Sequence, residues 1–142
     1  WAERLDAEVP QAAEWAAGRA AILAAVSVCS GRQLPAPAAK GAERLLGRRW
    51  RDARSLADLA GALPRSAAWP LAAIADPQDL WRSEARWWGR LAEDGLLMAR
   101  TPRPGPGPVV GAAASLMADA WQLGAALEVA LRGGREPDHV LG

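Results

Sequence analysis

The residue types that most often carry catalytic or metal-binding chemistry are few and scattered in this sequence. His139 is the only histidine and Cys29 the only cysteine, so the chain forms no internal disulfide and offers no Cys/His cluster for structural zinc. The segment GPGP is a proline-rich link, and the phosphate-binding pattern G-x-G-x-x-G is absent. We therefore expect no enzymatic activity, no metal and no cofactor. Cys29 lies at the apolar end of a predicted helix and is expected to be a small buried residue.

One acidic residue stands apart from the rest. Most carboxylates lie at helical spacings from arginines, which is typical of solvated helix faces. Glu128 instead projects near the stripe that carries Met117 and Trp121. If it is buried it needs a partner, because an isolated buried carboxylate is very costly. A salt bridge to Arg132 or Arg86 is one interpretation, and a proton-handling role is the other.

A local run of positive charge could contact an acidic partner. Five arginines fall within eleven positions, with Asp52 among them: Arg44, Arg48, Arg49, Arg51 and Arg54. A solvated loop face is the alternative interpretation. Because the net charge is only +1 and no recognition motif is present, we expect no nucleic-acid binding.

Tryptophan supplies all the aromatic bulk, since the eight Trp residues are accompanied by no Phe or Tyr. Together with one Lys against sixteen Arg and an excess of Ala, this indicates a coding bias toward GC-rich codons. Four of the tryptophans could line a ligand pocket or pack in a core: Trp81, Trp87, Trp88 and Trp121.

The elements that position these residues are all predicted to be helices, because Ala, Leu, Arg and Glu dominate and no alternating run is present. Ser55 is a predicted N-cap with Asp58 at N3, and Asp76 a predicted N-cap with Pro77 in the first turn. Ser66 can cap one short helix. The expected helices cover Trp1 to Val9, Pro10 to Cys29, Ala39 to Leu46, Leu56 to Leu63, Ala67 to Ala75, Asp76 to about Arg100, and Pro108 to Arg132, the last two enclosing the link Thr101 to Pro108.

The last of these helices is predicted to be the central packing element. It carries one apolar stripe at helical period: Leu116, Ala120, Leu123, Leu127 and Leu131. A short link of four prolines and two glycines precedes it and favours an antiparallel hairpin with the helix before. Trp121 is expected to be largely buried there, near Trp87 or Trp88.

The chain is predicted to be a single-domain, all-α bundle of about six helices with a C-terminal helical hairpin. The helical domain covers 1–134, and 135–142 is expected to be a flexible tail. We expect a soluble, cytoplasmic chain, since no signal peptide is visible and no apolar run reaches the ~20 residues that span a bilayer. We also expect it to be a piece of a longer chain, because the sequence starts with Trp1 inside a helix-like pattern and not with Met.

The last part of the chain resembles the family of C/d-type subunits in rotary (V-type and A-type) ATPases. The Pro/Gly link and PVVGAAASLMADAWQLGAALEVALRGG are similar to the helix that ends that family's last helical repeat. RSLADLAGALPRSAAWPLAAI resembles its short helix, proline turn and aromatic, with Trp69 where tyrosine is usual. The resemblance spans most of Gln11 to Gly134. The family's polar residues are replaced here. Its Lys-Glu pair falls at Ala120-Trp121 and its later acidic residue at Leu123, while its Asn falls at Ala126 and its Arg at Glu128. The chain therefore resembles a diverged relative.

The resemblance implies a non-enzymatic coupling subunit of an ion-transporting complex, which links the central stalk to the membrane rotor ring. Its partners would be other protein subunits, and it would be peripheral to the membrane only through them. The hypothesis from another class is a stand-alone helical ligand-binding or regulatory domain with a Trp-lined pocket.

Overall fold

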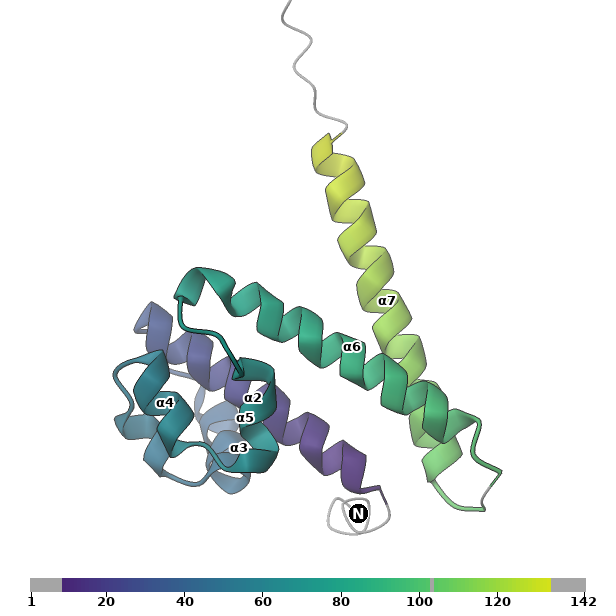
Figure 1. Ribbon diagram of the computed structural model, residues 1–142, viewed down its shortest axis with the longest axis horizontal. Helices are drawn as coiled ribbons and strands as arrows, with labels where there is room; N and C mark the ends of the chain where they lie inside the picture. Colours follow the sequence, from purple (N-terminus) through teal and green to yellow (C-terminus); the bar gives the residue numbers. More distant parts are fainter. Residues whose placement is uncertain (1–8, 103, 134–142) are drawn as a thin grey trace, which may run out of the picture.

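The structure, a computed structural model, describes residues 9–102 and 104–133. Within these ranges the chain is an all-α, single-domain bundle without strands, as the composition predicted (Figure 1). The expected helix at Trp1 to Val9 and the expected tail lie almost wholly outside the described residues. The α-helices are α2 (Pro10–Ser30), α3 (Ala36–Leu46), α4 (Leu56–Ala62), α5 (Arg65–Ala68), α6 (Leu80–Ala99) and α7 (Gly107–Gly133). Short 3-10 turns are η1 (Arg49–Asp52), η2 (Trp69–Leu71) and η3 (Pro77–Asp79).

The central packing element is α2, not the C-terminal helix. It contacts α3, α4, α5, α6 and η2, and Ala21, Ala24 and Ala25 on it are fully buried. Small side chains let its neighbours approach closely. A Cβ on Gly18 would lie 2.9 Å from the Trp69 ring. By length and composition α2 could also cross a bilayer, but a buried core helix meets the same criterion.

Two short helices begin or end differently from the prediction. α3 begins at Ala36 rather than Ala39, because Pro37 is tolerated in its first turn. The predicted Ser66-capped helix over Ala67 to Ala75 is wrong. Only α5 forms, and it passes into η2 before Ala73 adopts a φ of 62° that ends the segment.

The predicted capping at Ser55 is confirmed. Its Oγ accepts the Asp58 backbone N–H at 3.1 Å, and the Asp58 carboxylate accepts the Arg54 backbone N–H at 3.1 Å. Hydrogen bonds from the Ser55 side chain and then from the Arg54 amide lower the pKa of Asp58. Asp76 also caps as predicted, accepting the Gln78 N–H at 2.8 Å, but it starts η3 and the α-helix follows from Leu80.

The C-terminal hairpin packs through small residues. α7 turns back over the end of α6 and then runs out from the body (Figure 1). A Cβ on Gly111 would lie 2.6 Å from the Gly95 carbonyl oxygen and the Ala99 nitrogen. Ala114 and Ala118 on the same face of α7 are buried. The two backbones therefore touch, which no larger residue at Gly111 would permit.

This packing overturns the predicted role of the leucine stripe. Leu116, Leu123, Leu127 and Leu131 are exposed by 70%, 65%, 63% and 73%, and Ala120 is exposed as well. The physical reason is that α6 presents Gly95, and this flat site accepts the small-residue face of α7. The bulky stripe is thereby turned to the opposite side.

Candidate functional site

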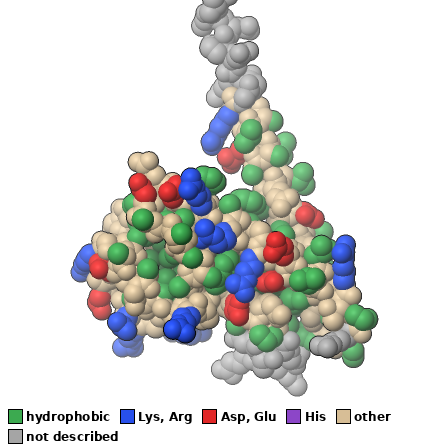
Figure 2. Space-filling model, viewed as in Figure 1, with side chains coloured by type: hydrophobic (Ala, Val, Ile, Leu, Met, Phe, Trp, Pro, Cys, Tyr) green, Lys and Arg blue, Asp and Glu red, His purple; other side chains and the backbone are tan. Residues whose placement is uncertain are grey.

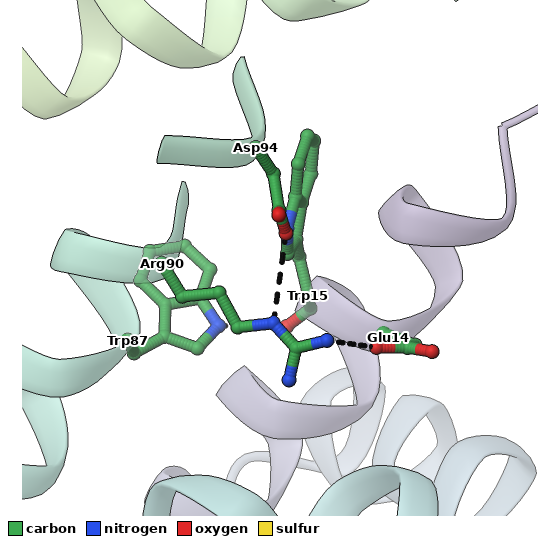
Figure 3. Close-up of polar contacts among 5 residues, drawn as sticks. All are labelled: Glu14, Trp15, Trp87, Arg90 and Asp94. Carbon is green, nitrogen blue, oxygen red and sulfur yellow. Dashed lines mark hydrogen bonds and ion pairs between the residues drawn. The ribbon is translucent and has the colours of Figure 1, made fainter. Parts of the chain in front are cut away.

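The most connected polar cluster joins α2 to α6 (Figure 3). Arg90 forms ion pairs with Glu14 and, at 3.5 Å, with Asp94. Trp15 donates its indole N–H to Asp94 at 2.9 Å, and Trp87 donates its own to the Trp15 carbonyl at 2.8 Å. All five residues are tied to one another, so the cluster fixes α6 on α2.

The charged groups of this cluster are matched with one another. Each carboxylate is paired, and the Arg90 guanidinium also lies 4.6 Å from the centre of the Trp69 ring. Sequence reasoning missed the cluster because its α2 and α6 members are 72 to 79 residues apart and no spacing rule links them. Over residues 9–102 and 104–133, no three His, Cys, Asp or Glu side chains gather as a metal site.

The structure leaves the five predicted arginines on the surface. They run from α3 through η1 to the residue before the α4 cap, and Arg44, Arg48, Arg49, Arg51 and Arg54 are all exposed. Arg51 pairs with Glu43 at 3.0 Å and lies 5.9 Å from the centre of the Trp50 ring. This region is thus a solvated face with an excess of positive charge.

Three of the four tryptophans that could line a pocket or pack in a core meet where α6 packs on α7. Trp87 is buried, and its ring packs edge to face on Trp88 with 4.8 Å between the ring centres. The Trp88 ring stacks on Trp121 with 5.4 Å between the ring centres. Trp121 is half-buried rather than largely buried. Trp81 is 64% exposed, with the Arg82 guanidinium 5.4 Å from its ring centre. Trp87, Trp88 and Trp121 therefore pack in the interface between α6 and α7, whereas Trp81 lies on the surface.

The two remaining candidates, Glu128 and Cys29, are both exposed, which contradicts the burial expected of Cys29. Glu128 pairs with Arg132 at 3.1 Å, which confirms that partner, but it is not buried and the argument for proton handling loses its basis. Arg86 instead donates to the carbonyls of Pro70 and Ala72. Cys29 lies at the last turn of α2, where its side chain reaches solvent. Partial desolvation raises the pKa of its thiol, which favours the unreactive protonated form.

The most unusual surface is the free part of α7, which we call the α7 arm and define as residues 122–132. Every residue of the arm is exposed, and only Glu128 and Arg132 are charged. Hydrophobic side chains follow the projecting helix in Figure 2. A helix that is apolar on most of its faces is normally covered, and large exposed apolar patches mark interaction sites.

The apolar stripe continues along the whole of α7. Val109, Leu116, Leu123, Leu127 and Leu131 each expose between 63% and 73% of their surface. At 100° per residue they fall on one side of the helix, opposite Gly111, Ala114 and Ala118. We call this set the α7 stripe. Its steps of seven, seven, four and four resemble the seam along which one helix packs on another.

Comparison with known proteins gives no relative from which to infer a function. No family model, no curated protein and no solved structure matches the chain.

Proposed function

We propose that this chain is a non-catalytic structural subunit that binds other protein subunits through the α7 stripe. Following the sequence resemblance, we assign it the role of a coupling subunit between the central stalk and the membrane rotor ring of a rotary ATPase-like complex. In that role it is cytoplasmic and reaches the membrane only through its partners. The observation that carries the proposal is the full exposure of the α7 arm.

The geometry of the stripe favours a helical partner. Leu116, Ala120, Leu123 and Leu127 follow one another at steps of four, three and four, which is the spacing that interlocks with a second helix. The small side chain of Ala120 between the leucines leaves room for the knob of a partner. We therefore propose that the occupant is an amphipathic helix of a neighbouring subunit.

The base of α7 is fixed well enough to present the stripe in one direction. Gly95 and Gly111 hold α6 and α7 in backbone contact, and Trp88 stacks on Trp121 beside them. α6 is in turn held on α2 by Arg90 and its two carboxylate partners. A docking surface on a rigid support loses less conformational entropy on binding.

The stripe alone gives a marginal complex, so the proposal includes a second contact. Burying the exposed two thirds of five aliphatic side chains contributes roughly 5–10 kcal/mol before association costs. Association costs about 4–15 kcal/mol. The exposed arginines from α3 to η1, among them Arg44, Arg48 and Arg49, are the proposed second contact, to an acidic surface. Binding through them weakens as salt increases.

The test is affinity purification of the full-length protein from its native membranes. We expect wild type to recover stalk or ring subunits of a rotary ATPase, and the double variant Leu123→Gln/Leu127→Gln to recover at least about tenfold less, since two anchors of the interface become polar. The matched control is Ala125→Gln/Val129→Gln, which alters exposed arm residues off the stripe and should retain the partners.

Three outcomes would contradict parts of the proposal. Equal recovery by both double variants would show that the stripe is not the docking surface. Recovery of only a second copy of this chain would replace the coupling role with self-association. Recovery of no rotary ATPase subunit by abundant wild type, folded by circular dichroism, would remove the family assignment.

A further inference from the structure

A cavity of about 710 Å³ lies away from the α7 stripe, between the end of α2, the loop 31–35, the start of α3 and η1. Its volume falls within the roughly 300–1,000 Å³ of pockets that take small organic ligands. Its lining combines three arginines with an apolar wall. No residue of α7 contributes to this lining.

The charge around the cavity is one-sided. Arg32, Arg51 and Arg54 line it, and no carboxylate does. Two acids contact these arginines. Glu43 pairs with Arg51 Nε, whereas Asp58 accepts a hydrogen bond from the backbone N–H of Arg54 and not from its guanidinium group. Within the described part of the chain, the guanidinium groups of Arg32 and Arg54 form no ion pair. The cavity therefore presents guanidinium donors suited to oxyanions.

The start of α3 adds an independent preference for an anion. The N-cap residue, Pro35, forms no side-chain capping hydrogen bond, and Ala36 and Ala39 of the first turn line the cavity. A helix N-terminus carries partial positive charge and unpaired N–H groups, which attract phosphate or carboxylate.

Part of the lining is apolar. Trp50, Val28 and Leu34 contribute to it, and Trp50 is only 6% exposed. The indole Nε1 of Trp50 is buried and has no hydrogen-bond partner among the described residues. A buried donor without an acceptor is costly, so the Nε1 of this lining residue would be stabilised by any acceptor that comes within hydrogen-bond distance.

The rim is ordered by local hydrogen bonds. Ser27 Oγ donates to the Arg32 carbonyl at 2.6 Å, and the Arg32 N–H donates to Ser30 Oγ at 3.3 Å. Gly31 adopts the left-handed conformation, with a φ of 66°, that ends α2 and starts the loop. The backbone of Arg32 is thus held at the cavity without any ligand.

We propose that this cavity binds a small organic anion, with its oxyanion at Arg32, Arg54 and the α3 N-terminus and its apolar part against Trp50. The oxyanion is a phosphate monoester or a carboxylate, because both match the planar donors of arginine. The site is independent of the proposed coupling function and can exist whether or not α7 binds a partner.

The test is titration of the purified protein with four probes, followed by the indole N–H signals in ¹H–¹⁵N spectra. The probes are phenyl phosphate, benzoate, inorganic phosphate and neutral benzyl alcohol. Phenyl phosphate or benzoate should shift one indole signal saturably, with a dissociation constant on the order of 1 mM or below. Whichever binds more tightly identifies the head group. Inorganic phosphate should bind more weakly, and benzyl alcohol should not bind.

The matched variants separate a built site from general positive charge. Arg32→Gln/Arg54→Gln removes two lining arginines and should weaken binding at least about tenfold. Arg48→Gln/Arg49→Gln removes the same charge from exposed neighbours outside the lining and should change affinity less than about twofold. Equal weakening by both variants, tight binding of benzyl alcohol, or no saturable shift with any anionic probe would overturn the proposal.

Discussion

The two longest helices of this protein, α2 and α7, are both rich in Ala but differ in how far the rest of the chain covers them. α2 lies in the middle of the body with Ala21, Ala24 and Ala25 fully buried, whereas the α7 arm exposes every residue. Both helices are strongly apolar, so composition does not distinguish them. What distinguishes them is the number of neighbours: α2 packs on several elements, and the main contact of α7 is α6 alone. Apolar composition alone thus does not show whether the rest of the chain covers a helix.

The largest expected contrast comes from one substitution made in each region. Leu59 is fully buried in the core around α2. The substitution Leu59→Ala should lower the free energy of unfolding by about 2–5 kcal/mol, because it leaves a cavity. Leu127→Ala in the arm should change it by less than about 0.5 kcal/mol, since the side chain is already solvated. Urea denaturation of both variants measures the difference.

A large loss for Leu127→Ala in the isolated protein would break the comparison. It would mean that the α7 arm is covered within the folded protein itself, by another copy or by a segment outside the described residues. Repeating the measurement over a wide range of protein concentration distinguishes these two, because only self-association depends on concentration.

A smaller contrast is expected between two glycines of α7. A methyl group at Gly111 would meet backbone atoms at 2.6 Å, so Gly111→Ala should force α6 and α7 apart and cost roughly 1–3 kcal/mol. At Gly124 a Cβ meets nothing within 4 Å, so Gly124→Ala should stabilise the helix by up to about 1 kcal/mol. Thermal unfolding followed by circular dichroism checks both. Stabilisation by Gly111→Ala as well would show that the two helices do not touch at Gly111.

The smallest expected effect is a pH response confined to the body. Hydrogen bonds lower the pKa of Asp58 below its ordinary value of 3.8, so the stabilisation is present above that value and is lost as pH falls through the lowered pKa. At pH values below this lowered pKa, backbone amides in the first turn of α4 should exchange with solvent faster than they do at higher pH, relative to amides of the α7 arm. Asp58→Asn should abolish this difference, as hydrogen exchange at each pH can show. An unchanged response in the variant would place its origin elsewhere.

Local signals in the sequence were sufficient for most of the described helices and for two caps, but not for the expected helix over Ala67 to Ala75. Ser55 and Asp76 cap where their residue types predict. The exchange of roles between α2 and α7 could not be predicted. The period of the leucine stripe indicates an apolar face of α7. The close contact between α6 and α7 depends instead on Gly95 and Gly111, which have no side chain and so add nothing to the hydrophobic pattern.

The cavity and the polar cluster illustrate the same limit. Arg90 meets Glu14 across 76 residues of sequence, and Arg32 shares a lining with Arg54 from a separate element. Such sets arise only when the chain is folded, because no spacing rule connects their members. The arginine run from Arg44 to Arg54 is visible in the sequence, yet only Arg51 and Arg54 of that run line the cavity.

The exposed arm also has a consequence for the life of the protein in a cell. If the α7 stripe binds a partner as proposed, newly made copies without that partner would expose an apolar helix to chaperones and proteases, and survival of the chain would depend on assembly. We therefore expect its abundance to follow the supply of whatever covers the α7 stripe. Synthesis in excess should yield aggregates or degradation products rather than a larger free pool.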